Sequence, residues 1–315
     1  MKILVVGAGA VGGYFGGRLL QAGRDVTFLV RPKRASELRQ NGLVIKSPSG
    51  DATLPNPPTV LADKLDHPFE LVLLSCKAYD LENAIESFRP AVGDKTMILP
   101  LLNGMRHLDA LDNRFGAEKV LGGRCVISAT LNEQREIVHF LPGHSIALGE
   151  RSGEISERVK SVYSALAEAG FDTLASDRIL SVMWEKWVML ASLAGCTTLM
   201  RASIGEIASA PGGSDFVLGL IEECCHIADL EGHPIAMPTM ESTRARLTKH
   251  DSTLTASMFR DMEQHSRIEA DHVIGDLLQR GEKHSVSHDS DSYARLRIVY
   301  ANLKAYENRF LKTAK

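Results

Sequence analysis

The sequence predicts an α/β domain with a doubly wound parallel sheet, followed by an all-helical domain. Short β-branched runs alternate with helical stretches in the first half of the chain. The apolar run at residues 71–74 is continuous rather than alternating, as in a strand that helices cover on both faces. From about residue 176 onward, long segments with apolar residues at helical spacing replace the strands. We therefore predict domains at residues 1–175 and 176–315.

The first domain is predicted to begin with a strand, a helix and a second strand, at residues 2–6, 11–22 and 25–30. This order is typical of a parallel sheet, because a crossover helix joins parallel neighbours. Later strands are predicted at residues 71–76, 96–101 and 120–130. Four prolines and a glycine at residues 47–58 favour hairpins or an irregular loop. Residues 139–149 suggest antiparallel edge strands.

The second domain is predicted to contain long helices at residues 179–199, 216–230, 257–278 and 293–310. Their apolar residues recur with the period of a helix that packs one face against a core.

Length and composition exclude several classes of protein. With 315 residues the chain exceeds what one hydrophobic core usually covers, and 36 Lys and Arg against 39 Asp and Glu leave no basic excess for nucleic acid. The longest candidate for a membrane span, residues 182–197, is short and contains Glu185 and Lys186. Five cysteines without CxxC spacing indicate reduced thiols, and 11 histidines show no ligand spacing. We therefore expect a cytoplasmic protein with no metal site, no membrane span and no nucleic-acid partner.

A glycine-rich motif, Gly7-Ala8-Gly9-Ala10-Val11-Gly12, lies between the first predicted strand and the first predicted helix. In a dinucleotide-binding unit the first glycine permits the tight turn, the second lets backbone approach a pyrophosphate, and the third allows close helix packing. Free N–H groups at the helix N-terminus also favour an anion. The motif therefore predicts a Rossmann-type sheet with a cofactor at Gly7, Gly9, Ala10, Val11 and Gly12. A glycine-rich turn without a ligand is the alternative.

Arg31 follows the second predicted strand, where an NAD-binding protein usually has Asp or Glu for the ribose 2′-hydroxyl. Lys33 and Arg34 come shortly after it. A guanidinium can engage a 2′-phosphate through two hydrogen bonds and stack on an adenine. The sequence therefore favours NADPH or NADP+ as the cofactor, with an ordinary solvated basic loop as the alternative.

Two more polar residues, Lys77 and Asn103, follow the apolar runs that end at residues 76 and 102. Doubly wound folds bind ligands outside the carboxyl ends of their strands, so we expect both residues to face the cofactor. Asn103 offers an amide to a carboxamide or a ribose hydroxyl. As half of an Asn-Gly pair it is also typical of a simple turn.

Lys186 and Glu269 are the candidates for acid–base chemistry in the second half. Only Lys186 and Glu185 carry charge at residues 182–197, and an ammonium beside apolar groups tends to have a lowered pKa, which suits a proton donor. A snorkelling lysine or a salt bridge is the alternative. Glu269 lies four residues after His265 on a stripe that becomes polar, which favours a cleft-facing carboxylate. A solvated helix face is the alternative.

As a whole the chain resembles the ketopantoate reductases, also called 2-dehydropantoate 2-reductases, along nearly its full length. The resemblance rests on segments in the order that the family shows: MKILVVGAGAVGGYFGGRL at the N-terminus, Arg31, Cys76-Lys77, Leu102-Asn103-Gly104-Met105, Trp184-Glu185-Lys186-Trp187, and Ser257-Met258 to Glu269. It implies an N-terminal NADPH-binding Rossmann domain, a helical C-terminal domain and an active site in the cleft between them.

The resemblance also implies roles for individual residues. Lys186 would protonate the 2-oxo oxygen of the substrate as hydride arrives from the nicotinamide. Glu269 would bind the substrate hydroxyl and hold Lys186 in place, and Asn103 would position nicotinamide and substrate. Ser257 would bind the substrate carboxylate, and Lys77 would lie at the cofactor. These roles are chemically consistent, because an alkoxide that develops at a carbonyl carbon needs a nearby acid or fixed cation.

The chain departs from the family pattern at several positions. Ketopantoate reductases commonly carry asparagines one and two turns after the catalytic lysine, where this chain has Leu190 and Ala194. Because both share a helix face with Lys186, we expect a more apolar substrate pocket. Arg106 stands where glycine is usual, and residues 286–288 lack a proline that is often found there.

We therefore expect an NADPH-dependent oxidoreductase for a small 2-oxo acid, with 2-dehydropantoate, a precursor in pantothenate and coenzyme A biosynthesis, as the first candidate. A paralogous reductase acting on another 2-oxo or β-hydroxy acid is one alternative. A non-catalytic NADP-sensing protein is another, although such a protein has no need of Lys186 together with Glu269. The expected partner is a small-molecule substrate, and whether the protein also forms a homodimer is left open.

Overall fold

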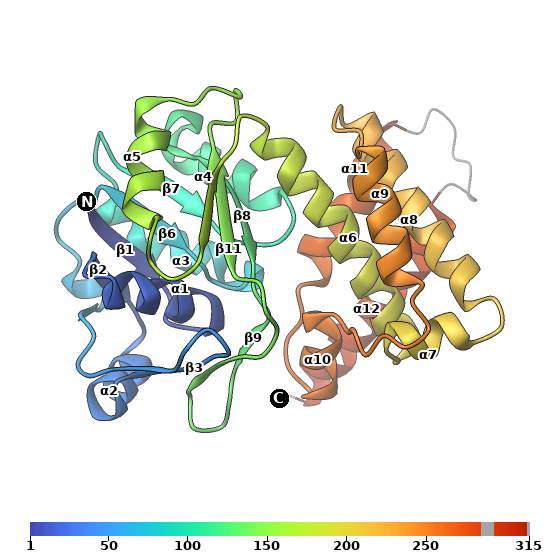
Figure 1. Ribbon diagram of the computed structural model, residues 1–315, viewed down its shortest axis with the longest axis horizontal. Coiled ribbons are helices and arrows are strands. Elements are labelled where there is room, and N and C mark those ends of the chain that lie inside the picture. The colour runs from blue at the N-terminus through green and yellow to red at the C-terminus, as the bar shows by residue number, and fades with distance from the viewer. Residues whose placement is uncertain (285–292, 314–315) are drawn as a thin grey trace. The chain divides into compact units, whose positions relative to one another are not determined.

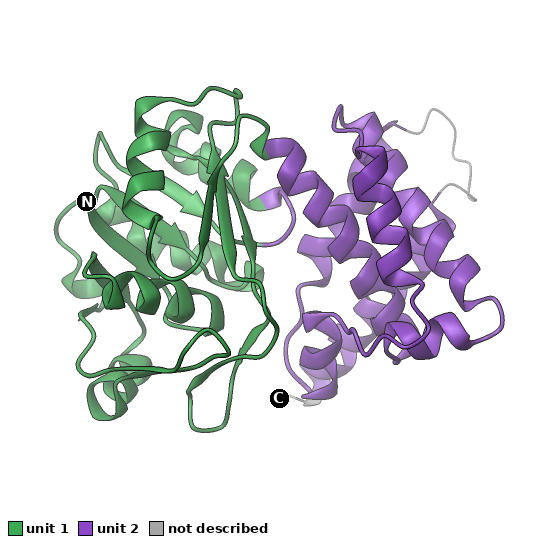
Figure 2. Ribbon diagram, viewed as in Figure 1, with its two compact units in different colours: residues 1–102, 107–179 green, residues 103–106, 180–315 purple. Residues whose placement is uncertain are grey.

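The computed structural model describes residues 1–284 and 293–313, so residues 286–288 lie outside the described residues. The chain forms two compact units, drawn in green and purple in Figure 2. Unit 1 contains Met1–Leu102 and His107–Ile179, and unit 2 contains Asn103–Arg106 and Leu180–Lys315. The main part of unit 2 therefore begins a few residues after the predicted boundary, and a short segment from the first half of the chain belongs to it.

Unit 1 is built on a wholly parallel sheet of five strands in the order β5-β2-β1-β6-β7 (Figure 1). Its strands are β1 (Lys2–Val6), β2 (Asp25–Leu29), β5 (Thr59–Val60), β6 (Leu71–Leu74) and β7 (Met97–Pro100). Its α-helices are α1 (Ala10–Gln21), α2 (Pro32–Asn41), α3 (Leu81–Phe88), α4 (Arg106–Phe115) and α5 (Glu157–Leu166). Short 3-10 helices are η1 (Ala62–Lys64), η2 (Ala78–Asp80), η3 (Arg89–Ala91) and η4 (Ala117–Lys119).

The strand order explains where a ligand would bind in unit 1. The chain runs outward from β1 to β2 and β5, and then returns to place β6 and β7 on the other side of β1. All residues of β6 and the last four of β1 are buried, as continuous apolar runs predict. The predicted doubly wound parallel sheet is therefore confirmed, and its switch point lies between β1 and β6, where such folds open a ligand crevice.

Two smaller sheets complete unit 1, in the orders β4-β3-β10-β9 and β12-β11-β8. Their strands are β3 (Leu43–Lys46), β4 (Ala52–Leu54), β8 (Gly122–Val126), β9 (Ala129–Leu131), β10 (Ile137–His139), β11 (Ser145–Gly149) and β12 (Asp172–Ala175).

Predictions for these segments met different outcomes. Residues 47–58 contain part of a hairpin as expected, because β3 and β4 pair antiparallel. The single strand predicted at residues 120–130 is wrong, since β8 and β9 belong to different sheets and the chain must leave one to join the other. The edge-strand prediction for residues 139–149 is also wrong for β11, which pairs antiparallel with β8 and parallel with β12 and so lies inside its sheet.

The described residues after residue 178 form helices and connecting loops only, which confirms the predicted all-helical part. The α-helices are α6 (Ile179–Met200), α7 (Ile204–Ser209), α8 (Gly213–Leu230), α9 (Met237–Leu247), α10 (Ser257–Glu263), α11 (Asp276–His284) and α12 (Ala294–Thr313). A short π-helix, η5 (Asp271–Gly275), leads directly into α11.

The single helix predicted at residues 257–278 is wrong. α10 ends at Glu263, and His265 then adopts φ +49° in the left-handed region. The Ser266 N–H turns back to Asp261 O at 2.8 Å and the His265 N–H to Met262 O at 3.0 Å, a pattern that ends helices. Glu269 follows in a non-helical segment. The helical stripe that was predicted to carry Glu269 therefore does not exist.

α6 is long and apolar enough to cross a membrane. Its 22 residues extend beyond residues 182–197, the candidate span that the sequence analysis judged too short. Within the fold, however, 61% of its most apolar window is buried. Trp184 and Trp187 are among the largest fully buried or nearly buried side chains. Packing in the core of a folded unit therefore accounts for the apolar composition of α6.

Candidate active site

The glycine-rich loop lies at the carboxyl end of β1 and leads into α1. Gly7 adopts φ +93°, and its N–H donates to Leu29 O at 2.9 Å. A Cβ on Gly12 would lie 2.1 Å from Ser75 Oγ and 2.3 Å from Gly7 O, so glycine is needed for α1 to approach this loop. A Cβ on Gly9 would meet nothing within 4 Å. The backbone before α1 is therefore open to close approach by a pyrophosphate, as the motif predicts.

Ala10 and Val11 are the first two residues of α1, and no side chain caps this helix. Their N–H groups are among those that have no acceptor within a helix. Together with the positive end of the helix dipole, they form a suitable site for a phosphate group.

Arg31 is the residue directly before α2 and lies at the carboxyl end of β2. Its side chain is 73% exposed, and its Nη2 lies 3.1 Å from Asp80 Oδ1. Asp80 ends η2, the short helix after β6, so this ion pair joins the loops that follow β2 and β6. Because Arg has five N–H donors, an exposed guanidinium in such a pair retains donors for a ligand.

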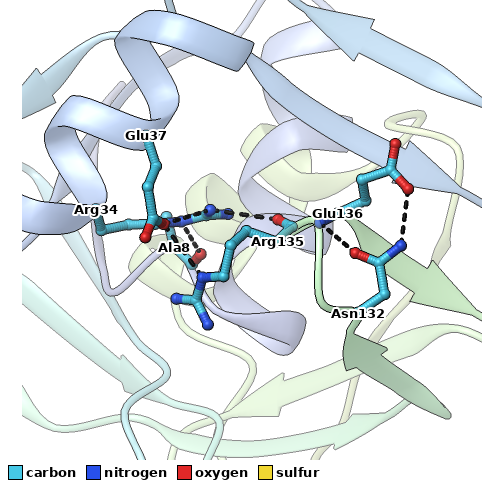
Figure 3. A network of polar contacts seen from close by, with 6 residues as sticks. All are labelled: Ala8, Arg34, Glu37, Asn132, Arg135 and Glu136. Atoms are coloured by element: carbon cyan, nitrogen blue, oxygen red, sulfur yellow. Dashed lines mark hydrogen bonds and ion pairs between the residues drawn. The ribbon is translucent and has the colours of Figure 1, made fainter.

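A second basic group lies beside the glycine-rich loop (Figure 3). The Arg34 Nε donates to Ala8 O at 3.0 Å, and its Nη1 donates to Glu37 Oε2 at 3.1 Å and to Arg135 O at 3.3 Å. The Arg135 Nε donates to the same Glu37 oxygen at 3.2 Å. Sequence analysis noted Arg34 only as a neighbour of Arg31 and missed Arg135. No local pattern could have shown this contact, because 101 positions separate the two arginines.

Burial affects the pKa values of Arg34 and Glu37. Arg34 is 11% exposed, and burial lowers the pKa of its guanidinium. Burial also opposes ionisation of Glu37, but hydrogen bonds from Arg135 and Arg34 outweigh it and hold the pKa of this carboxyl below its ordinary value. The Arg34 Nη2 is buried and has no hydrogen-bond partner among the described residues. A buried donor of this kind at a predicted nucleotide site fits an acceptor that the ligand supplies.

Lys77 directly precedes η2, at the carboxyl end of β6. The Ser75 Oγ donates to Val6 O at 2.9 Å, which ties the end of β6 to the end of β1. Lys77 is therefore on the loop that borders the switch point of the sheet, where the sequence predicts a cofactor contact.

Asn103 follows β7 but belongs to unit 2. Its backbone hydrogen-bonds with the ring of His272, which is 7% exposed. Gly104, with φ +73°, makes room for this histidine, since a Cβ there would lie 2.8 Å from His272 O and 3.2 Å from its ring Cδ2. His272 comes shortly after Glu269 in the chain. The structure thus brings Asn103 to the segment that follows Glu269, through a residue that the sequence analysis missed.

The charged groups around His272 come from the Asn103–Arg106 segment and from residues on either side of η5. Burial lowers the pKa of its imidazole, and Arg106 adds to this effect. Glu269, Asp276 and the backbone of Asn103 act in the opposite direction without reversing it. A largely neutral imidazole near neutral pH therefore links the Asn103 loop to η5.

Lys186 is half-buried in α6 and lies between two tryptophans of the same helix. The rings of Trp184 and Trp187 are 4.7 Å apart. The Trp187 Nε1 donates to Val273 O in η5 at 2.9 Å. η5 is therefore the element that joins the three segments with the predicted catalytic residues: His272 holds the Asn103 loop, Val273 holds the Lys186 helix, and Glu269 shortly precedes it.

Three predicted pocket residues lie on the helices of unit 2. Leu190 is half-buried and Ala194 is buried, one and two turns after Lys186 on α6. Ser257 is exposed as the first residue of α10.

Arg106 lines a pocket of about 410 Å³ in unit 2, which residues of η5 and α11 also line. Asp271, Tyr300 and Lys304 also line it. The Tyr300 hydroxyl donates to Asp271 Oδ1 at 2.7 Å, and Lys304 Nζ donates to the same oxygen at 2.9 Å. Arg106 therefore lies among charged groups rather than on an apolar surface. Among the described residues, no group of three or more His, Cys, Asp or Glu could hold a metal ion.

Comparison with known families agrees with this architecture. A family model described as ketopantoate reductase PanE/ApbA matches residues 3–153, and the model for the C-terminal part of ketopantoate reductase PanE/ApbA matches residues 178–307. The chain belongs to this family. The resemblance predicted from sequence is therefore confirmed.

Relatives of this ketopantoate reductase family member cover most or nearly all of the chain. It is 38% identical over 308 residues to the uncharacterized oxidoreductase YkpB of Bacillus subtilis, covering 98% of this chain and 99% of that protein. It is 26% identical to the 2-dehydropantoate 2-reductase of Mesorhizobium japonicum, covering 89% and 91%. The family is thus one of oxidoreductases.

Solved structures share its fold. The 2-dehydropantoate 2-reductase from Geobacter metallireducens GS-15 has a TM-score of 0.87 and 27% identity, covering 97% of this chain and 99% of that chain. A ternary structure of D-mandelate dehydrogenase with NADH and anilino(oxo)acetate has a TM-score of 0.86 and 22% identity, covering 98% and 99%.

In this ketopantoate reductase family member the two units carry different chemical groups. Unit 1 offers helix N–H groups and arginines, which are suited to the phosphates and ribose of a nucleotide. Unit 2 offers an ammonium, an amide and a carboxylate on segments joined by η5. An ammonium of this kind can stabilise or protonate an alkoxide that develops at a carbonyl carbon.

Proposed function

We propose that the protein is a cytoplasmic NADPH-dependent reductase that converts a small 2-oxo acid into the 2-hydroxy acid, with 2-dehydropantoate as the first candidate. One observation carries this proposal: η5 ties together the segments that hold Lys186, Asn103 and Glu269. A protein that only senses NADP has no use for such an arrangement.

The preference for NADPH is supported by residues of unit 1. Gly9 leaves the loop before α1 open, and the exposed Arg31 stands where a ribose-reading carboxylate would otherwise repel a 2′-phosphate. When bound, the cofactor supplies the hydride. The protein's own residues bind and orient the reactants and move the proton.

In the proposed reaction a hydride adds to C2 of the substrate, and the carbonyl electron pair moves to oxygen. The Lys186 ammonium gives that oxygen a proton, so a hydroxyl forms, and the amine is reprotonated from solvent. Glu269 accepts a hydrogen bond from the substrate hydroxyl, and the Asn103 amide orients nicotinamide and substrate. Ser257 donates its hydroxyl to the substrate carboxylate. If 2-dehydropantoate is the substrate, the product is pantoate and the enzyme serves pantothenate biosynthesis.

A second candidate substrate is a 2-oxo acid with a plain hydrocarbon side chain. Leu190 and Ala194 share the Lys186 face of α6, and they replace two amides that are common in ketopantoate reductases. Each neutral hydrogen bond lost would cost about 0.5 to 1.5 kcal/mol of binding. An apolar side chain would instead gain about 25 cal/mol for every Å² removed from water. D-mandelate dehydrogenase, which shares the fold, was solved with the 2-oxo acid derivative anilino(oxo)acetate.

The test is NADPH oxidation with 2-dehydropantoate, 3-methyl-2-oxobutanoate and benzoylformate. We expect turnover with at least one of them. A higher kcat/KM for the hydrocarbon acids supports the second candidate, and a strong preference for 2-dehydropantoate supports the first. NADPH binding without any turnover would instead support the NADP-sensing alternative.

A double variant, Leu190→Asn with Ala194→Asn, separates the two substrate candidates further. If both residues line the pocket, it should shift kcat/KM towards 2-dehydropantoate. The control is Leu199→Asn, which changes a half-buried leucine on a different face of the same helix and should leave the ranking unchanged.

A further inference from the structure

Arg135 lies in the tight turn between β9 and β10, which hydrogen bonds hold on both sides (Figure 3). Its backbone adopts φ +65°, and its N–H donates to Asn132 O at 2.9 Å. The Glu136 N–H donates to Asn132 Oδ1 at 2.8 Å, and the Asn132 Nδ2 donates to Glu136 Oε2 at 2.7 Å. This closed set of bonds fixes the direction in which Arg135 leaves the turn.

The side chain of Arg135 is fixed at one atom and free at two others. Its Nε donates to Glu37 Oε2 at 3.2 Å, and the side chain is 47% exposed. In the described part of the chain, neither Nη1 nor Nη2 of Arg135 has a hydrogen-bond partner. A guanidinium held by its Nε presents the two remaining nitrogens as a fork, which matches the spacing of phosphate oxygens.

Arg34 connects Arg135 to the predicted nucleotide site, because its guanidinium bonds both to Arg135 O and to the glycine-rich loop. Glu37 holds Arg34 as well as Arg135, so one carboxylate places two guanidinium groups side by side with a positive charge in excess. Arg34 in turn bonds to Ala8 O within the glycine-rich loop. The ribose of a bound dinucleotide lies between this loop and the end of β2 in folds of this type. Arg34 therefore links Arg135 to this loop, and Arg31 lies three residues before Arg34, at the carboxyl end of β2.

We propose that Arg135 is a specificity-determining residue that binds the 2′-phosphate of NADPH together with Arg31. The inference rests on the proposed function, because it concerns the same cofactor. Arg34 and Glu37 hold Arg135 beside α2 before the ligand arrives, so little ordering is required on binding. The alternative is that Arg135 serves only as a tie between α2 and the β9–β10 turn.

The experiment measures dissociation constants of NADPH and NADH by fluorescence for the full chain and for Arg135→Ala. We expect NADPH to bind about tenfold more weakly to the variant, or about 1.4 kcal/mol, while NADH changes by less than about twofold. The control is Arg39→Ala. It removes an exposed cation from α2, the helix that carries Arg34 and Glu37, and should leave the ratio of the two dissociation constants unchanged.

Two additions keep the test decisive. Adenosine 2′,5′-bisphosphate and adenosine 5′-monophosphate probe the 2′-phosphate without any catalytic step, and only the first should lose affinity in Arg135→Ala. Arg135→Lys retains the charge without the fork, so it should bind NADPH with an affinity between those of the unmodified protein and the alanine variant. The thermal unfolding temperatures of both Arg135 variants, compared with that of the unmodified protein, show whether the substitutions disturb the fold.

The outcomes separate this inference from the proposed function. If the unmodified protein prefers NADPH and Arg135→Ala retains the whole preference, Arg135 is only a structural tie and the inference is overturned. If the unmodified protein binds both nucleotides equally, the NADPH part of the proposed function fails and the inference fails with it. A preference that is lost in Arg135→Ala but not in Arg39→Ala supports both.

Discussion

The two units position their candidate functional residues in different ways. In unit 1, Gly7, Arg31 and Lys77 each follow a strand of one parallel sheet, so backbone pairing sets their relative positions. In unit 2, Asn103 and Lys186 come from distant segments that side-chain hydrogen bonds tie to η5. A sheet spreads the positioning over many backbone bonds, whereas η5 depends on single side chains. We therefore expect single substitutions to perturb the site of unit 2 more than that of unit 1.

The π-helical conformation of η5 is consistent with its role in positioning residues of unit 2. A π-helix is a rare, single-turn feature that occurs often at functional sites. In η5 this turn carries both His272 and the carbonyl of Val273 that accepts from Trp187. The same short element thus receives the Asn103 loop and the Lys186 helix.

The largest effect is expected from Lys186→Ala. Loss of a proton donor should lower turnover by about a hundredfold or more while NADPH affinity stays nearly unchanged. Steady-state kinetics together with nucleotide titration measure both quantities. Glu269→Ala should instead weaken substrate binding along with turnover, because Glu269 is assigned to the substrate hydroxyl.

A matched control for Lys186→Ala is Lys249→Ala, which removes an exposed lysine of unit 2. It should leave both turnover and binding unchanged. If Lys186→Ala retained near-normal turnover, Lys186 would be a structural lysine, and unit 2 would not supply the proton donor.

A second prediction tests the contact between the Asn103 loop and η5. Gly104→Ala places a Cβ 2.8 Å from His272 O and forces alanine into φ +73°, so backbone must shift. Left-handed backbone alone costs about 1 to 2 kcal/mol. We expect a lower free energy of unfolding and about a tenfold loss of turnover, because a displacement near 1 Å has effects of that size or more.

Gly23→Ala is the matched control, since Gly23 has φ +74° and nothing within 4 Å of its built Cβ. It carries the same backbone cost without the collision. Urea unfolding and kcat, measured for both variants, separate strain from contact. Equal losses of turnover in the two variants would contradict the role of His272 in positioning Asn103.

Local signals in the sequence predicted part of the fold and part of the candidate site. The order of β1, α1 and β2 was predictable because the glycine motif and a continuous apolar run are local signals. Glu269 was predicted as a site residue, but the helix predicted to carry it is wrong. No Gly or Pro marks the break, and it is instead His265 that takes the left-handed conformation.

Contacts between distant segments were beyond the reach of the sequence. Arg135 lies far from Arg34 in the chain and reaches it only because β10 pairs with β3, close to the helix that carries Arg34. His272 had no distinguishing pattern either, since its role depends on the loop at Gly104. The split between β8 and β9 arises in the same way, from which sheet each strand joins.

A third prediction concerns the nucleotide site of unit 1. Arg31→Ala should remove most of a preference for NADPH over NADH that we expect to be at least tenfold, or about 1.4 kcal/mol. The fold and the NADH affinity of this variant should change little, because the Arg31 side chain is 73% exposed and pairs with Asp80 at the surface. Titration with both nucleotides measures the ratio, and equal affinities in the unmodified protein would show that the interpretation of Arg31 is wrong.

The smallest effect concerns a buried side-chain cluster within unit 1, which is an exception to the rule that its backbone does the positioning. The rings of His139 and His144 stack at 5.3 Å, and the Tyr14 hydroxyl lies 2.5 Å from His144 Nδ1. Burial lowers the pKa of both imidazoles below their ordinary value of 6.5. The neighbouring His144 adds to this effect at His139, and Arg18 adds to it at His144.

The sign of the pH dependence follows from these shifts. Below about pH 6.5 the unfolded chain takes up protons that the folded cluster does not, so the free energy of unfolding falls as the pH is lowered. The contribution is fully present above that pH and is lost as the pH falls through the folded pKa values. Urea unfolding between about pH 7.5 and pH 5 should therefore show a slope that His144→Gln reduces, because glutamine can still accept from Tyr14 but does not titrate. If His144→Gln kept the slope of the unmodified protein, the cluster would have no part in the pH response.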